Sequence, residues 1–296
     1  MFFHHSRTQH SFTLIELLVV IAVIGLLSAI VAVSVKDARE KAKIAKLQVY
    51  SDSVRAQLSD DLISFWSFDE GTGTTTQDVW SNNKGTLGNG SCTPGNGSCP
   101  SWLAGISGQA LSFGGDDYVD AGNNISLLPD TFTVAAWVKT PGNGYLPLVS
   151  WAGATPAVYV RYAYLDSTRA LIYLGGTSYR YFDQSPVNVL DDNWHYVVFV
   201  VTGNGQADIT NSKLYVDGQK QTVSATSSSG GPSSKTNFYI GRAGSSYFNG
   251  LIDDPRLYNR ALTAQQIKDN YYAGLRKLLA QGRITEKEYQ ELVKSL

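Results

Sequence analysis

The arrangement of apolar and polar residues divides the chain into segments of different kinds. Residues 17–35 are nearly all apolar and contain no charged side chain. This segment is long enough to form a helix that crosses a bilayer. Residues 36–62 mix alanine and valine with charged residues of high helix propensity, and no glycine or proline separates them from the apolar run. We therefore predict one helix over residues 12–62, with a membrane span at about residues 14–35.

The middle of the chain has a different pattern. Between residues 63 and 273, short runs rich in Val, Tyr, Phe and Trp alternate with Gly, Asn, Asp and Ser; TFTVAAWVKT, WHYVVFVVT and SKLYVDGQ are examples. Many of these runs show the period of two that half-buried strands require. Many short strands with glycine-rich turns predict an all-β sandwich or barrel over residues 63–273.

The last segment returns to a helical pattern. Thr263 is a suitable N-cap, Gly282 ends the run LRKLLAQG, and Thr285 with Glu288 forms a capping-box sequence. We predict a C-terminal helical hairpin over residues 274–296, which resembles the SHOCT-like segments found at protein C-termini. Such a hairpin either packs on the sheet or binds a partner.

Composition narrows the class of partner. The formal net charge is −1 and 17% of the residues are charged, so no basic surplus points to nucleic acid. Gly, Ser, Thr, Asn and Tyr are plentiful in the middle of the chain. This composition is typical of an extracellular, turn-rich β domain rather than of a cytosolic helical enzyme.

The N-terminal residues SFTLIELLVVIAVIGLLSAI closely resemble the signature of type IV prepilins and type II secretion pseudopilins. The resemblance implies a leader of residues 1–11, cleavage between Ser11 and Phe12 by a prepilin peptidase, and methylation of the new amine of Phe12. The family usually has Gly where this chain has Ser11. A carboxylate at the edge of a membrane span is costly and points to function, and the resemblance implies that Glu16 contacts other pilin-like subunits during assembly. The alternative is an ordinary signal anchor.

Six segments of the middle region occur in the order LISFWSFDEGTGTTTQDVWSNNKGTL, GQALSFGGDDYVDAG, FTVAAWVKT, DNWHYVVFVV, LYVDGQ and FNGLIDDPRLYNRALTAQQI. Together they resemble the laminin G-like, concanavalin A-like jelly-roll family. The resemblance implies a two-sheet jelly-roll sandwich that binds sugars, proteins or calcium. Pro255 stands where the family usually has a hydrophobic residue, and it predicts an edge or a β-bulge.

Some jelly rolls of this shape are glycosidases, which need two suitably spaced carboxylates. Residues 63–272 contain one glutamate, Glu70, in a loop-like sequence, and one histidine, His195, in an apolar strand. A lone histidine in such a strand is more often packed or hydrogen-bonded than catalytic. We therefore expect no enzymatic activity.

The sequence favours calcium binding over catalysis, because calcium takes carboxylate and carbonyl oxygens as ligands. Asp69 and Asp78 follow the first predicted strand and Asp253 lies in the last; in jelly rolls of this type these strands tend to be neighbours. The three aspartates are thus candidate calcium ligands, or else solvated turn residues.

A candidate ligand face lies in the aromatic segments VYVRYAYL and TSYRYF. It would use stacking planes and hydrogen-bond donors suited to sugars, from Tyr159, Arg161, Tyr179, Arg180 and Tyr181. The alternative for strand tyrosines is ordinary sheet packing.

The sequence has two cysteines, Cys92 and Cys99, in a loop rich in Gly, Pro and Asn. In an exported protein this pair predicts a small disulfide ring, with free thiols as the alternative.

These observations favour a pilin-like subunit, of a pilus or pseudopilus, that displays a lectin-like domain for adhesion or for glycan or protein binding. It would be a single-pass protein of the cytoplasmic membrane before assembly and part of a surface filament afterwards, with its C-terminal domain extracellular or periplasmic. The alternatives are a membrane-anchored carbohydrate-binding protein that never polymerises and a tethered glycoside hydrolase.

Overall fold

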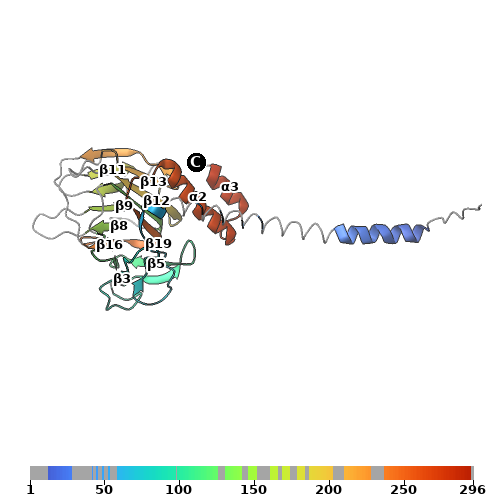
Figure 1. Ribbon diagram of the computed structural model, residues 1–296, viewed down its shortest axis with the longest axis horizontal. Helices are drawn as coiled ribbons and strands as arrows, with labels where there is room; N and C mark the ends of the chain where they lie inside the picture. The colour runs from blue at the N-terminus through green and yellow to red at the C-terminus, as the bar shows by residue number, and fades with distance from the viewer. Residues whose placement is uncertain are drawn as a thin grey trace, which may run out of the picture. The chain divides into compact units, whose positions relative to one another are not determined.

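The computed structural model describes most of the chain. The described residues are 13–28, 42, 45, 49, 53, 59–97, 99–125, 131–141, 146–151, 161–165, 169–173, 179–183, 187–202, 210–227 and 237–294. The chain forms two compact units, Met1–Val49 and Tyr50–Leu296, and each is described by itself (Figure 1).

The first unit contains a helix over residues 14–28, whose apolar side chains are exposed. Among the described residues, no helix is both long and apolar enough to cross a membrane. Residues 29–35 of the predicted span, and most of the predicted helix beyond them, lie outside the described residues.

The second unit is built on two β-sheets (Figure 1). The first, called sheet I, runs in the order β14 (Gln219–Lys220), β13 (Lys213–Val216), β12 (Trp194–Val201), β7 (Phe132–Lys139), β19 (Asn249–Tyr258), β5 (Gln109–Gly114) and β4 (Ser101–Ala104), with β1 (Leu62–Phe65) also paired to β19. A 3₁₀ turn, Ser59–Asp61, precedes β1.

Sheet II runs in the order β15 (Val223–Ser227), β11 (Tyr179–Asp183), β10 (Arg169–Tyr173), β9 (Arg161–Leu165), β8 (Leu146–Trp151), β16 (Phe238–Ile240), β6 (Val119–Asp120), β3 (Gly85–Leu87) and β2 (Thr75–Thr76). A small hairpin pairs β17 (Arg242–Ala243) with β18 (Ser246–Tyr247). Every strand pairing among the described residues is antiparallel, so the predicted two-sheet β architecture is confirmed.

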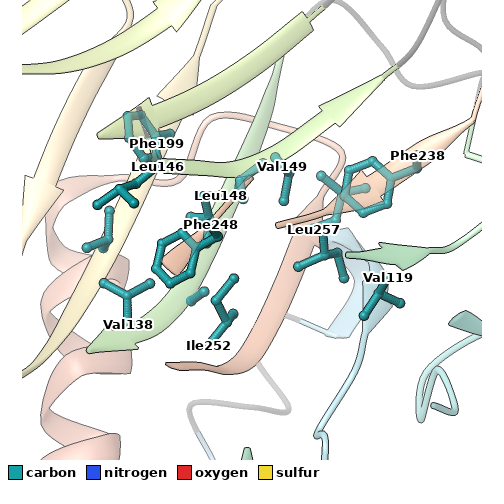
Figure 2. Close-up of a cluster of buried hydrophobic side chains, with 14 of the residues drawn as sticks. Val119, Val138, Leu146, Leu148, Val149, Phe199, Phe238, Phe248, Ile252 and Leu257 are labelled. Atoms are coloured by element: carbon teal, nitrogen blue, oxygen red, sulfur yellow. The ribbon is translucent and has the colours of Figure 1, made fainter. Parts of the chain in front are cut away.

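The hydrophobic core lies between the two sheets (Figure 2). Val138 of β7, Phe199 of β12 and Ile252 of β19 meet Leu148 of β8 and Phe238 of β16 there. In β7, β12 and β19 alternation sends every second side chain into this layer, as the period of two predicts, whereas a register irregularity in β8 places both Leu148 and Val149 there.

The other face of sheet I is also buried. The helix α2 (Ala264–Ala280) covers it and packs Tyr271 against Trp137 of β7 and Tyr196 of β12. Strands β7 and β12 are therefore covered on both faces, which explains why FTVAAWVK and WHYVVFVV are almost continuously apolar instead of strictly alternating.

The C-terminal tail is helical, as predicted, but its limits differ. Thr263 caps α2 in a capping box with Gln266, and the helix runs on to Ala280, so the predicted boundary at residue 274 falls inside it. After Gly282, which has a left-handed φ of 67°, α3 (Glu286–Lys294) folds back on α2. Of the two predicted roles for the tail, the structure shows packing on the sheet.

Pro255 interrupts the long strand β19. Its pairing with β7 shifts register between Asp253 and Arg256, and Asp254 has a left-handed φ of 51°. This is a β-bulge in an interior strand, so of the two predicted settings for Pro255 the bulge is correct. The bulge turns Asp254 and Arg256 into the region beneath α2.

Candidate functional site

The helix of the first unit begins with a reciprocal cap. The Oε2 atom of Glu16 accepts hydrogen bonds from the backbone N–H of Thr13 at 2.8 Å and from its hydroxyl at 2.9 Å. The hydroxyl of Thr13 in turn accepts a bond from the N–H of Glu16 at 3.3 Å. Glu16 therefore satisfies the open N-terminus of its own helix, where a negative charge is favoured. The predicted cleavage residues, Ser11 and Phe12, lie outside the described residues.

The disulfide prediction is confirmed: Cys92 and Cys99 are joined, with their Cα atoms 5.5 Å apart. Inside the ring, the N–H of Gly95 donates to the carbonyl of Cys99 at 3.0 Å. Cys99 is fully buried at the margin of the main core, so the ring fixes the loop between β3 and β4 to the sandwich.

Two of the three candidate calcium ligands, Asp69 and Asp253, are close enough for their charges to interact. Asp253 is fully buried on β19, and its Oδ2 atom accepts the N–H groups of Ile106 at 2.8 Å and Ser107 at 3.3 Å. Its Oδ1 atom is buried without a hydrogen-bond partner. Burial, the charge of Asp254 and the nearby charge of Asp69 raise the pKa of Asp253 to about 8. Asp253 thus offers a buried carboxyl group with an open oxygen, whereas Asp69 is exposed, and carboxylate oxygens are the ligands that a hard cation takes.

Asp78 has another role. Its Oδ1 atom accepts the backbone N–H groups of Phe65 at 3.0 Å, Trp80 at 2.9 Å and Ser81 at 3.0 Å, and thereby joins β1 to the following loop. In the described part of the chain, no group of three or more His, Cys, Asp or Glu residues is placed to hold a metal ion. The structure thus does not assemble all three predicted ligands, and the calcium site stays a prediction.

The predicted ligand face is only partly described. Tyr159 lies outside the described residues; Arg161 lies on β9 and Tyr179 on β11, where only their backbones are described. Arg180 donates to the hydroxyl of Thr226 at 2.9 Å and shares a face with buried Phe182, whereas Tyr181 lies on the opposite face.

The guanidinium of Arg169 lies 4.1 Å from the ring centre of Tyr181. Ala170 and Phe182 point into the core, so alternation along the strands places Arg169 and Tyr181 on the outer face of sheet II. The prediction that Arg180 and Tyr181 share one ligand face is therefore wrong, because adjacent strand residues point to opposite sides. Tyr181 keeps its place on the predicted face, with Arg169 as a neighbour that the sequence reading omitted.

Another cluster of tyrosines was missed entirely. The guanidinium of Arg242 lies 4.8 Å from the ring centre of Tyr118, 5.2 Å from that of Tyr239 and 5.6 Å from that of Tyr247. All four side chains are partly exposed. Tyr239, Arg242 and Tyr247 lie close together in the sequence, in the YIGR and SSY segments, which could have indicated part of the cluster. Tyr118 is far from them in sequence, so no local motif indicates the complete cluster.

His195 is held between two carboxylates. Its Nδ1 atom lies 2.6 Å from Oδ2 of Asp217, and its Nε2 atom lies 3.0 Å from Oδ1 of Asp191. The residue is 8% exposed. The expectation that this histidine is hydrogen-bonded within the fold is confirmed.

Comparison with known families identifies two regions of the chain. Residues 113–268, more than half of the sequence, match the concanavalin A-like lectin/glucanases superfamily. The chain belongs to this superfamily. Residues 6–32 match the prokaryotic N-terminal methylation motif, so the predicted fusion of a prepilin signature with a concanavalin A-like domain is confirmed. No curated protein gives a significant match to the chain.

Solved structures support the superfamily fold. Domain 4 of AbnA, an extracellular GH43 arabinanase from Geobacillus stearothermophilus solved in complex with arabinotriose, aligns with a TM-score of 0.53 and 18% identity over 71% of this chain and 98% of that domain. The binding domain of Paraclostridial mosquitocidal protein 1 aligns with a TM-score of 0.53 and 14% identity, over 74% of this chain and 53% of its own. The binding domain of botulinum neurotoxin serotype G aligns with a TM-score of 0.53 and 13% identity, over 73% of this chain and 51% of its own.

The methylation motif adds a processing step to this lectin-like fold. It implies that the chain is a substrate of a prepilin peptidase and assembles with other pilin subunits. It also indicates a membrane-anchored pilin with its concanavalin A-like domain outside the cell.

Proposed function

We propose that the protein is a subunit of a surface filament whose concanavalin A-like domain binds carbohydrate and serves adhesion. The observation that carries this proposal is the union, in one chain, of a methylation motif containing Glu16 and a lectin-like sandwich. The methylation motif supports assembly into a filament, and the sandwich offers a binding surface. The arabinotriose complex of the arabinanase domain supports a sugar as the ligand of such a sandwich.

The position of the C-terminal tail supports our choice of one face of the sandwich as the binding surface. Helix α2 occupies the outer face of sheet I, so that face is not available to a ligand. The outer face of sheet II carries Arg169, Tyr173 and Tyr181. Tyrosine rings and a guanidinium provide apolar planes and hydrogen-bond donors, which suit the two faces and the hydroxyl groups of a sugar. We assign carbohydrate binding to this face.

A binding role suits the carboxylates better than hydrolysis does. Oε1 of Glu70 accepts hydrogen bonds from the hydroxyl of Thr76 at 3.1 Å and the N–H of Gln77 at 2.6 Å, so it works within its own loop. Asp253 is fully buried, and His195 is bound on both ring nitrogens. Glu70 and His195 thus take part in hydrogen bonds within the fold, and the burial of Asp253 keeps it from a substrate, which supports a protein that is not an enzyme.

The assembly half is tested with Glu16→Gln, which keeps the size of the side chain and removes its charge. We expect cleavage and membrane insertion to persist while the ratio of sheared surface protein to membrane-bound protein falls about tenfold or more, the loss expected for a charge-assisted contact. Glu291→Gln, an exposed change on α3, is the matched control. An unchanged ratio for Glu16→Gln would instead support the anchored protein that never polymerises.

The binding half is tested on a glycan array with the full chain in detergent micelles. We expect saturable binding that Tyr181→Ala weakens, because the substitution removes a stacking plane from sheet II. The hydrolase alternative predicts the release of reducing ends from the same glycans, lost on Glu70→Gln. Absence of binding to any glycan would overturn the proposed function.

A further inference from the structure

Arg242 is the centre of a second surface feature of the concanavalin A-like domain. It lies on β17 directly opposite Tyr247 of β18, while Tyr239 comes from β16 and Tyr118 immediately precedes β6. The rings of Tyr118 and Tyr239 meet edge to face, with their centres 5.8 Å apart and their planes at 82°. Segments that are distant in sequence therefore build one partly exposed cage of tyrosines around a single guanidinium.

The guanidinium is positioned but not neutralised. Its Nε atom donates to the carbonyl of Gly244 at 3.1 Å, and the hydroxyl of Ser150 holds the backbone carbonyl of Arg242 at 2.6 Å. Within the described residues, Arg242 forms no ion pair and no other side-chain hydrogen bond. The nearby carboxylate of Asp120 instead accepts the N–H of Gly122 at 2.8 Å and the amide of Asn237 at 3.4 Å.

Stacking and anion binding use different parts of a guanidinium. Aromatic rings contact its flat faces, whereas its terminal N–H groups lie in the plane and point outward from the edge. The tyrosines can therefore hold Arg242 in place while its terminal nitrogens bind the two oxygens of a carboxylate. Burial raises the pKa of the Tyr239 hydroxyl, as does the charge of Asp120, so this hydroxyl stays protonated and able to donate at neutral pH.

We propose that this cage, formed by Arg242, Tyr118, Tyr239 and Tyr247, is a subsite for the carboxylate of an acidic sugar, a uronic or a sialic acid. The guanidinium pairs with the carboxylate, and tyrosine rings and hydroxyls contact the sugar ring and its hydroxyl groups. The proposal rests on the proposed carbohydrate binding and adds to it a preference for charged glycans. The cage differs from the Tyr181 region, because it is built by β6, β16 and the β17–β18 hairpin.

The experiment measures binding by calorimetry to the full chain in detergent micelles, with matched acidic and neutral probes. Trigalacturonic acid is compared with its methyl ester, and sialyllactose with lactose. We expect the acid of one pair to bind at least about tenfold more tightly than its neutral partner, as a charge-assisted hydrogen bond allows. The pair that shows this difference identifies whether the sugar is a uronic or a sialic acid.

Variants then assign the preference to the cage. Arg242→Gln should remove the advantage of the acid and leave the affinity for neutral sugars unchanged. Arg242→Lys keeps the charge but loses the planar pair of donors, so it should recover only part of the advantage. Tyr247→Phe keeps the ring and tests the hydroxyl. Arg260→Gln, which breaks a pair with Asp61 elsewhere on the domain, is the control and should change nothing.

Thermal unfolding of each variant shows that it is folded, and Arg242→Lys provides the decisive measurement if Arg242→Gln does not fold. Equal affinity for acid and neutral partner, or an acid preference that survives both Arg242 substitutions, would overturn the subsite and show that the cage only fastens the β17–β18 hairpin. In that case binding of neutral glycans would leave the proposed function intact. Failure to bind any glycan would overturn both.

Discussion

Gly274 of α2 lies directly against the indole of Trp137 on β7: a Cβ atom at this glycine would stand 2.3 Å from Cζ2 of the ring. Trp137 is itself 4% exposed and contacts Tyr196, with ring centres 5.2 Å apart. The missing side chain thus lets the helix backbone approach the sheet. This contact helps α2 to cover the outer face of sheet I, and the proposed ligand binding is therefore assigned to sheet II.

We predict that Gly274→Ala destabilises the domain. Helix propensity alone would favour alanine by about 1 kcal/mol, but the added methyl group must displace a buried indole, and overpacking costs about 1–3 kcal/mol. We expect a net loss of about 1 kcal/mol in the free energy of unfolding, measured in denaturant. Gly25→Ala is the matched control, because this helical glycine has nothing within 4 Å of the added atom. A more stable Gly274→Ala variant would contradict the close docking of α2.

A second prediction concerns the buried ion pair at the β-bulge. Nη2 of Arg256 lies 3.0 Å from Oδ2 of Asp254, and the two side chains are 11% and 8% exposed. Asp254→Asn would leave the charge of Arg256 buried without its partner, which costs about 3–5 kcal/mol. Asparagine also tolerates the left-handed φ of 51° at this position, so backbone strain is not the cause of the loss.

Asp192→Asn provides the comparison for that experiment. Asp192 also has a left-handed φ, of 59°, but its pair with Lys139 is exposed and spans 3.8 Å. We expect a loss below about 1 kcal/mol there. Both losses are measured by denaturant unfolding. Equal losses in the free energy of unfolding would show that the Asp254–Arg256 pair contributes no more to stability than an exposed ion pair does.

Local sequence patterns were sufficient where the structure depends on neighbours in sequence. The cap at Thr263, the Cys92–Cys99 ring and the bulge at Pro255 all involve residues close together in the chain. Each follows from the chemistry of one or two residues, such as the missing N–H of proline. The order of the six segments in the middle region then predicted the two-sheet sandwich.

Features that depend on distant segments could not be read in this way. The cage around Arg242 needs Tyr118, which only the pairing of β16 with β6 brings near it. Arg180 and Tyr181 form a promising sugar-binding pair in sequence, but the pleat separates them. Which aspartates approach Asp253 likewise depends on how the loops before β2 and β5 fold over β19.

The third prediction is a pH dependence that originates at His195. Burial alone lowers its pKa, but the hydrogen bonds and charges of Asp217 and then Asp191 outweigh burial, so the pKa is raised above 6.5. The folded state therefore binds the proton more tightly than the unfolded state does. This contribution is fully present below pH 6.5 and is lost as the pH rises through the raised pKa.

We therefore expect the wild-type free energy of unfolding to fall as the pH rises above about 6.5. His195→Gln should remove the part of that slope that originates at His195, and the raised pKa of Asp253, about 8, accounts for a remaining slope of the same sign. Denaturant unfolding at a series of pH values measures it, and NMR titration of the imidazole gives the pKa directly. A slope that persists unchanged in His195→Gln would assign the dependence to another group.

The last prediction concerns calcium, which the sequence placed at Asp69, Asp78 and Asp253. In the structure the charges of Asp69 and Asp253 interact, whereas Asp78 accepts backbone hydrogen bonds elsewhere. A cation beside the unpaired Oδ1 atom of Asp253 would offset the cost of burying this carboxylate. With two carboxylates, we expect a Kd of roughly 10⁻⁴–10⁻³ M, as in other weak extracellular sites.

Calorimetry and thermal unfolding of the full chain, stripped with a chelator, test this prediction. Calcium should give binding heat and raise the Tm of wild type, and Asp253→Asn should abolish both effects. Asp78→Asn distinguishes the two arrangements: it should lower the Tm by weakening the β1 loop but leave the binding heat intact. Loss of calcium binding in Asp78→Asn would restore all three aspartates as ligands, whereas wild type that shows neither heat nor a change in Tm would exclude calcium at Asp253.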